Sequence, residues 1–144
     1  NRCEGCHNPE SWELEAGHSM SIEEIAKEIE RQVGGVTFSG GDPFYQAEGF
    51  TALAQLIKRR TGKNIWCYTG LTFEQIIRQP DYARMLPHID VLVDGRFVLA
   101  LKSGEAVFRG STNQRLIDVP ASLAAGKAVT WAYNPKPEIC RSGL

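Results

Sequence analysis

Apolar residues recur at helical spacing in a segment near the start of the chain. Within 21–34 they fall on a single stripe, at Ile22, Ile25, Ile29 and Val33. This pattern predicts an amphipathic helix. Ser21 and Glu24 have the spacing of a capping box, and Gly34 suits the position just after the last turn.

Three further helices are predicted downstream. Helical periodicity covers 46–61, with inward-facing positions at Phe50, Leu53, Leu56 and Ile57. Gly62 ends that segment. A shorter helix, "TFEQIIRQ", begins at its cap Thr72 and is stopped by Pro80. A last short helix is expected near "PASLAAG".

Between the helices lie short apolar and β-branched runs that predict strands: "GVTFSGGDP", "NIWCYTG" and "HIDVLVDGRF". A looser β-rich stretch, "RFVLALKSGEAVFRGSTNQR", and a last strand, "KAVTWAY", are expected after them. Strands that alternate with helices and are apolar on both faces predict an α/β fold, with a mostly parallel sheet and outer helices. The 144 residues suit a single domain, 1–144, with five or six strands.

Composition narrows the possible functions. The net charge is -1 with both signs scattered, and no apolar run is long enough to span a membrane, so neither nucleic acid nor a membrane is an expected partner. The four cysteines, at positions 3, 6, 67 and 140, are too few for a secreted disulfide scaffold. We therefore expect a cytoplasmic protein, in which a close cysteine pair indicates metal or redox chemistry. Cys67, inside a strand, is predicted to be an inert core thiol.

In parallel sheets, ligands bind at the carboxyl ends of the strands. Three such ends carry glycine or charge, namely Ser39–Pro43, Thr69–Gly70 and Asp94–Arg96. The adjacent Gly40 and Gly41 would let a ligand approach the backbone closely. Asp42 can either accept a hydrogen bond from an ammonium group or cap the following helix, and the sequence leaves both alternatives open.

The cysteine pair lies in "NRCEGCHNPESW". A thioredoxin-like pair should open a helix, and Pro9 disfavours that alternative. A zinc site would need four ligands, which Cys3, Cys6, His7 and Cys140 would supply if the two chain ends meet. Closely spaced thiolates also bind iron–sulfur clusters, so zinc and iron–sulfur remain open on these residues alone.

Taken together, the cysteine loop and "TFSGGDP" resemble the radical S-adenosylmethionine (SAM) superfamily, whose cluster loop is C-x3-C-x2-C. Cys3 and Cys6 match its second and third cysteines, which implies a first cysteine two residues before Asn1. Further blocks resemble, in order and spacing, the activating enzymes of anaerobic (class III) ribonucleotide reductase: "RCEGCHNPESW", "FSGGDP", "IWCYTG", "VLVDGRFV" and "FRGSTNQR". His7 departs from the Tyr often found in that family, and Gly5 from the aromatic residue of the wider superfamily.

The resemblance implies a partial (β/α) barrel of radical SAM type and a set of site residues. Cys3 and Cys6 would be the catalytic and metal-ligating residues of a 4Fe–4S cluster, with Gly5, Cys6 and His7 against the cofactor. The methionine ammonium of SAM would be taken by Gly40, Gly41 and Asp42. The carboxylate and ribose end of SAM would be met by Asp94 and Arg96.

The implied activity is the reductive cleavage of SAM to a 5′-deoxyadenosyl radical. That radical would abstract hydrogen from a glycine of the anaerobic reductase, with a low-potential donor such as a flavodoxin as second partner. Other radical SAM enzymes are rivals, namely the pyruvate formate-lyase activase or a deazapurine-pathway enzyme. A zinc-stabilised binding module and a thiol–disulfide protein are rivals from other classes. The polar segment 109–115 is either a hydrogen-bonded turn or a docking loop.

Overall fold

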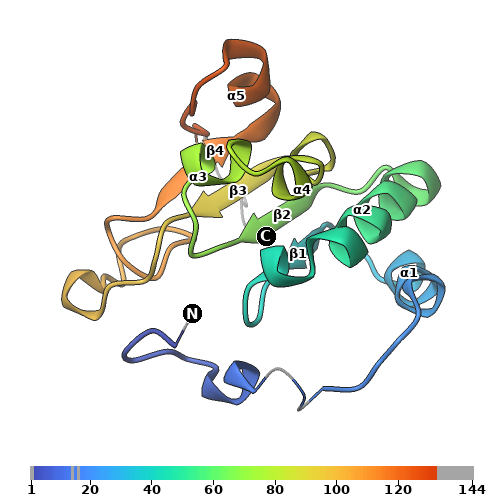
Figure 1. The fold of residues 1–144 in the computed structure, drawn as a ribbon, viewed down its shortest axis with the longest axis horizontal. Helices are drawn as coiled ribbons and strands as arrows, with labels where there is room; N and C mark the ends of the chain where they lie inside the picture. Colours follow the sequence, from blue (N-terminus) through green and yellow to red (C-terminus); the bar gives the residue numbers. More distant parts are fainter. Residues whose placement is uncertain (1, 14, 16, 133–144) are drawn as a thin grey trace, which may run out of the picture.

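A four-stranded sheet forms the centre of the computed structural model, which describes residues 2–13, 15 and 17–132. Its strands are β1 (Val36–Phe38), β2 (Ile65–Tyr68), β3 (Val91–Asp94) and β4 (Arg115–Asp118), in that order across the sheet. β1, β2 and β3 run parallel, and β4 is antiparallel to β3 (Figure 1). The α/β class and the mostly parallel sheet are therefore as predicted.

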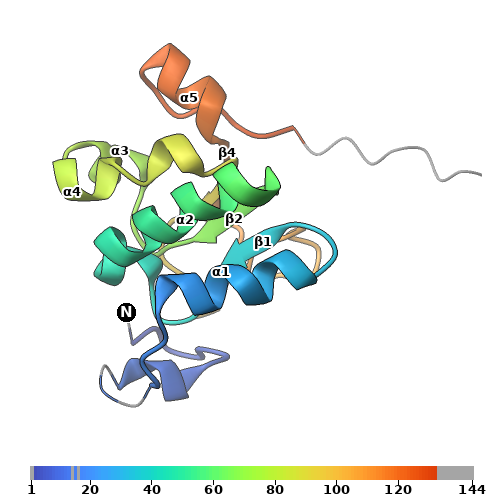
Figure 2. The same ribbon diagram turned by 90° about the vertical axis from the view of Figure 1, so that its right-hand side faces the viewer.

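Within the described residues, five α-helices accompany the sheet: α1 (Ile22–Arg31), α2 (Ala47–Thr61), α3 (Phe73–Ile77), α4 (Pro80–Ala83) and α5 (Val119–Ala125). The same part of the chain has four short 3-10 helices, at Pro9–Trp12, Pro43–Gln46, Leu86–His88 and Leu99–Leu101. α1 packs on α2, and both lie over the same face of the sheet (Figure 2). The N-terminal segment and α5 lie at opposite ends of the molecule in both views.

The helix ends follow the local signals of the sequence. Ser21 and Glu24 form the predicted capping box of α1, and Thr72 forms another at the start of α3. Gly62 ends α2 in the left-handed conformation, with φ +63°. The prediction for Val33 is wrong, because α1 ends at Arg31 and the Val33 side chain is fully exposed beyond it.

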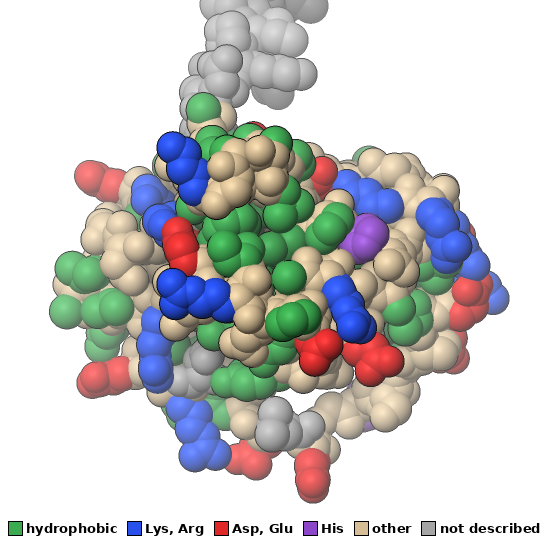
Figure 3. Space-filling view, turned by 45° about the horizontal axis from the view of Figure 1, so that its top comes forward, with side chains coloured by type: hydrophobic (Ala, Val, Ile, Leu, Met, Phe, Trp, Pro, Cys, Tyr) green, Lys and Arg blue, Asp and Glu red, His purple; other side chains and the backbone are tan. Residues whose placement is uncertain are grey.

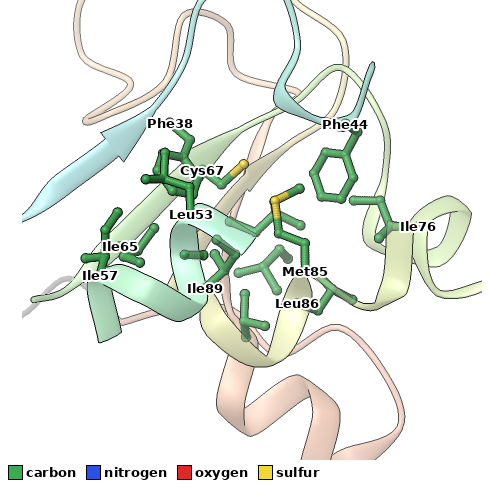
Figure 4. Packing of buried hydrophobic residues seen from close by; sticks show 14 of the residues in the cluster. Phe38, Phe44, Leu53, Ile57, Ile65, Cys67, Ile76, Met85, Leu86 and Ile89 are labelled. Atoms are coloured by element: carbon green, nitrogen blue, oxygen red, sulfur yellow. The ribbon is translucent and has the colours of Figure 1, made fainter. Parts of the chain in front are cut away.

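The main core lies between the helices and one face of the sheet (Figure 4). Alternate strand residues point into it, and the fully buried ones include Ile65, Cys67 and Leu92. They meet apolar side chains from α2 and from the segment 85–89. Burial raises the pKa of the Cys67 thiol, so the thiol stays protonated and unreactive, as predicted for a core cysteine.

The opposite face of the sheet is covered by a loop instead of helices. Residues 95–114, here called the wall loop, connect β3 to β4. Phe108 of this loop packs edge-on against Trp66 of β2, with ring centroids 5.0 Å apart, and Trp131 lies 5.1 Å from the same indole. The Tyr68 hydroxyl donates to the Phe108 carbonyl at 2.8 Å. The wall loop is therefore tied to the sheet that it covers.

Two expectations about the strands are corrected. The expected β-rich stretch 96–115 contains a 3-10 helix and one bridge, between Lys102 and Ser111, and the strand begins only at Arg115. The expected strand 127–133 contributes one bridge to β4 within its described part. Several backbone amides and carbonyls of the wall loop are hydrogen-bonded to side chains, so these groups need no strand partner. With four strands the sheet is open, and it does not support the radical SAM barrel expected from the resemblance.

The surface offers no single charged patch on the face shown in Figure 3, where basic and acidic side chains are interspersed. Among the helices of the described ranges, none combines the length and the apolar character that crossing a membrane requires.

Candidate functional site

The two cysteines lie on one tight turn of the N-terminal segment. Residues 2–8 are called the cysteine loop here. The Cys6 amide donates to the Cys3 carbonyl at 3.1 Å, and Gly5 between them has φ +71°. The Asn8 backbone amide donates a hydrogen bond to Cys6 Sγ, with 3.5 Å between the nitrogen and the sulfur. Both thiols are free and half-buried, an arrangement suited to thiolate ligands on one metal centre.

The cysteine loop closes a cavity of about 290 Å³ against the sheet. Its lining comes from the N-terminal segment, from three strand ends and from the wall loop: Arg2, Cys3, Cys6, His7, Asn8, Ser11, Trp12, Ser39, Gly40, Gly41, Tyr68, Thr69, Gly70, Gly95, Phe97, Gly110 and Gln114. The carboxyl ends of β1, β2 and β3 all meet there, as the rule for parallel sheets predicts.

The glycines after β1 leave the cavity wall without side chains. Gly40 has φ +107°, a backbone conformation that other residues rarely adopt. A Cβ on Gly41 would lie 3.2 Å from the Ser11 carbonyl oxygen, so a side chain there would crowd the N-terminal segment. The backbone of 39–41 therefore lies open to a ligand at this wall.

Asp42 takes the capping role that the sequence left as one alternative. Its buried carboxylate accepts from the Phe44 amide at 3.1 Å, at the start of the 3-10 helix Pro43–Gln46. It also accepts from the Thr69 hydroxyl at 3.1 Å and the Gly70 amide at 2.9 Å. Asp42 thus joins the ends of β1 and β2 beneath the cavity without lining it, and its contact with an ammonium group stays a prediction.

Asp94 and Arg96 also lie outside the cavity lining. Asp94 is 1% exposed, and its carboxylate accepts from Arg115 at 2.9 and 2.5 Å and from the Phe73 amide at 2.8 Å. Hydrogen bonds from Arg115 also lower the pKa of Glu74. Arg96 is exposed, and its carbonyl accepts from the Asn113 side chain. The cofactor contacts expected for Asp94 and Arg96 remain predictions.

The cysteine loop and the wall loop lie against each other both beside the cavity and within its lining. A Cβ on Gly5 would lie 2.7 Å from Leu99 Cδ1, so Gly5 backs onto the wall loop and does not line the cavity. The rings of His7 and Phe97 lie 6.3 Å apart. The segment 109–115 is a hydrogen-bonded turn, and its use as a docking loop stays a prediction.

Several lining residues were missed by sequence reasoning. Among the described residues that line the cavity, Arg2 is the one with a fixed formal charge, and no carboxylate belongs to the lining. Tyr68 could have been found, because it alternates with the core residue Cys67 and so points away from the helices. Phe97 and Gln114 carried no such signal, because a loop has no period that indicates a side-chain direction.

The donor set of the described residues fits part of a metal centre. Within these residues, no three His, Cys, Asp or Glu side chains are grouped to hold a metal ion, so Cys3, Cys6 and His7 of the alternative zinc set do not assemble into one there. Its fourth member, Cys140, lies outside the described residues. Cys3 and Cys6 fit as two thiolates of an iron–sulfur cluster, because both line the cavity and Cys6 Sγ already has a nearby amide donor.

Comparison with known proteins gives consistent matches. Residues 1–117 match the family described as 4Fe-4S single cluster domain. The chain is 37% identical to the anaerobic ribonucleoside-triphosphate reductase-activating protein of Haemophilus influenzae, over 78% of this chain and 77% of that protein. Identity to the proteins of the same name is 34% in Enterobacteria phage T4, over 80% and 75%, and 32% in Escherichia coli K12, over 78% and 77%. No solved structure matches.

Proposed function

The chain belongs to the anaerobic ribonucleoside-triphosphate reductase-activating proteins and to the 4Fe-4S single cluster domain family, and on that premise we propose that it is a radical SAM glycyl-radical activase. One observation carries the proposal most directly. The cysteine loop, at which the resemblance places the cluster, and the glycine turn after β1, at which it places SAM, line the same cavity.

Cys3 and Cys6 would hold the cluster as two of its thiolate ligands. When bound, the cluster would supply the electron that cleaves SAM into methionine and the 5′-deoxyadenosyl radical. The chain's own residues would bind and orient SAM and exclude water from its reactive end. Trp12 and Phe97 suit the last task, because both rings line the cavity.

The charges of the lining suggest how SAM is oriented. Backbone carbonyl groups at Gly40 and Gly41 would accept hydrogen bonds from the methionine ammonium, because no carboxylate lines the cavity among the described residues. Asp42 would support this contact indirectly, because its hydrogen bonds fix the turn that carries those carbonyls. The Arg2 guanidinium would pair with the methionine carboxylate, a role for which sequence reasoning had named Asp94 and Arg96.

The substrate would be a glycine of the anaerobic ribonucleotide reductase, from whose Cα the radical takes a hydrogen atom. The electron would come from a low-potential donor such as a flavodoxin, in the cytoplasm. Relatives named for the reductase support this target over pyruvate formate-lyase.

The proposal is tested on the full-length natural protein, reconstituted anaerobically with iron and sulfide. We expect a reduced-cluster electron paramagnetic resonance (EPR) signal that changes shape when SAM is added. Cys6→Ser should abolish it, and Cys67→Ala, the matched control, should keep it, since Cys67 is buried in the core. With SAM and a reductant, a glycyl radical should form on the anaerobic reductase and not on pyruvate formate-lyase. Bound zinc without sulfide would contradict the proposal and favour a binding module.

A further inference from the structure

We propose that Gln114 is a positioning residue, which holds the wall loop against the cysteine loop and thereby sets how tightly the cavity binds SAM. This inference rests on the proposed function only in taking SAM as the ligand. The positioning itself is a property of the wall loop, and it can be measured without SAM.

The Gln114 side chain makes three hydrogen bonds, all of them to backbone groups of the wall loop. It is 8% exposed and lines the cavity. Its Oε1 accepts from the Gly110 amide at 2.9 Å and from the Ser111 amide at 3.1 Å, and its Nε2 donates to the Gly95 carbonyl at 2.9 Å. One side chain thus joins the exit of β3 to the turn at 110–111, which are the two ends of the wall loop.

The three hydrogen bonds of the Gln114 side chain are called the clamp here. At the Gly110 end of the clamp, Phe97 connects it to the cysteine loop. A Cβ on Gly110 would lie 2.9 Å from Phe97 Cδ2, so the ring rests directly on the backbone that Gln114 holds. The Phe97 ring also lies 6.3 Å, between centroids, from the ring of His7, which follows Cys6 in the chain. A shift of Gly110 would therefore move the aromatic wall of the cavity and its contact with the cysteine loop.

Loss of the Gln114 side-chain amide would leave two backbone donors unpaired, one of them fully buried. Ser111 is fully buried, and its amide has Gln114 Oε1 as its acceptor. An unpaired buried amide costs free energy, so the turn would move to find water or another acceptor. SAM would then bind only to the fraction of molecules whose wall is in place, and its apparent affinity would fall by that fraction.

Asn113 provides a matched control. It lies in the same turn, and its side chain donates to a wall-loop carbonyl, that of Arg96, at 2.8 Å. It is exposed and does not line the cavity. Asn113→Ala therefore removes a side-chain hydrogen bond within the same loop and leaves the hydrogen bonds of Gln114 to Gly95 and Gly110 in place.

The experiment compares Gln114→Ala, Gln114→Glu and Asn113→Ala in the reconstituted full-length protein. We expect Gln114→Ala to weaken SAM binding by about 10- to 100-fold, with a much smaller change in kcat. Gln114→Glu keeps both acceptor bonds but sets a carboxylate oxygen against the Gly95 carbonyl oxygen in a buried site, so it should also weaken SAM binding. Asn113→Ala should stay within about threefold of the wild type. Far-UV circular dichroism confirms that each variant is folded.

Hydrogen exchange in the cluster-free protein without SAM gives the second readout. Gln114→Ala should speed exchange at the 110–111 amides and in the cysteine loop, with the core strands unchanged. Unchanged exchange at these positions, equal losses of SAM affinity in Gln114→Ala and Asn113→Ala, or wild-type SAM affinity in Gln114→Ala would overturn the inference. A wild-type protein that binds no SAM would instead overturn the proposed function, and exchange would still decide the positioning role.

Discussion

Replacing Arg115 with Met should destabilise the fold through the carboxylate that Arg115 leaves behind. Arg115 begins β4 and bridges Asp94 at the end of β3 and Glu74 in α3. Met keeps an unbranched apolar stem of similar length and removes only the charged donors. Asp94, which is 1% exposed, then has one remaining hydrogen bond among those named above, from the Phe73 amide at 2.8 Å.

The magnitude follows from burial. Removing one partner of a buried ion pair costs about 3–5 kcal/mol, because the other charge stays unpaired in a poorly solvated site. The Arg115 side chain is 40% exposed, so water would reach part of the vacated space and screen Asp94. We therefore expect a loss of about 2–3 kcal/mol in the free energy of unfolding.

Arg60 is the matched control, because it also bridges two carboxylates. Its side chain is 35% exposed, close to the value for Arg115, and it pairs with Glu23 at 2.8 Å and Glu30 at 3.2 Å. Both glutamates are well exposed, at 49% and 38%. Arg60→Met leaves no buried charge and should cost much less than Arg115→Met.

Urea unfolding followed by circular dichroism measures both variants, read as midpoints at an unchanged slope. Adding Asp94→Asn to Arg115→Met should recover part of the loss, because the side chain left behind is then neutral. If Arg115→Met costs no more than Arg60→Met, the reasoning from partner burial is refuted.

Two further predictions concern the cysteine loop and pH. Gly5→Ala should cost about 1 kcal/mol for its φ of +71° and also push Leu99 away, so it should lower iron retention on anaerobic desalting. Gly62→Ala is the control, because Gly62 has φ +63° and an added Cβ there would meet no neighbouring atom. It should lose only the stability that depends on the backbone conformation and should keep the iron. Equal loss of iron in both variants would contradict this prediction. The hydrogen bonds from Arg115 lower the pKa of Glu74 in the folded protein below its usual value of 4.5. As the pH falls, the unfolded chain therefore takes up a proton at this carboxylate before the folded protein does. The stabilisation by the Arg115–Glu74 pair is present above pH 4.5 and is lost as the pH falls below it. Glu74→Gln should flatten the fall of the urea midpoint between about pH 6 and pH 3, and an unchanged slope would argue against the pair.

Local signals in the sequence were enough to place most elements. The capping boxes at Ser21 and Thr72 and the glycine end of α2 need only residues within one turn of each other. The three strand ends also followed, because a run of apolar residues that breaks into glycine or charge marks its own boundary. β4 was not recognised as a strand, because the four residues "RLID" have no clear alternation and their pairing with β3 is antiparallel.

The sequence by itself determined a mostly parallel sheet whose strands end in glycine or charge, and the tertiary structure brought the cysteine loop to that carboxyl edge. Only the tertiary structure decided which polar side chains face the cavity. Asp42 and Asp94 stand at strand ends, but their carboxylates are taken by Thr69, 27 positions along the chain, and by Arg115, 21 positions along. Partners at such distances are brought in by packing, and a buried carboxylate turns toward the donors that reach it. The same packing brought Gln114 and Phe97 to the cavity wall.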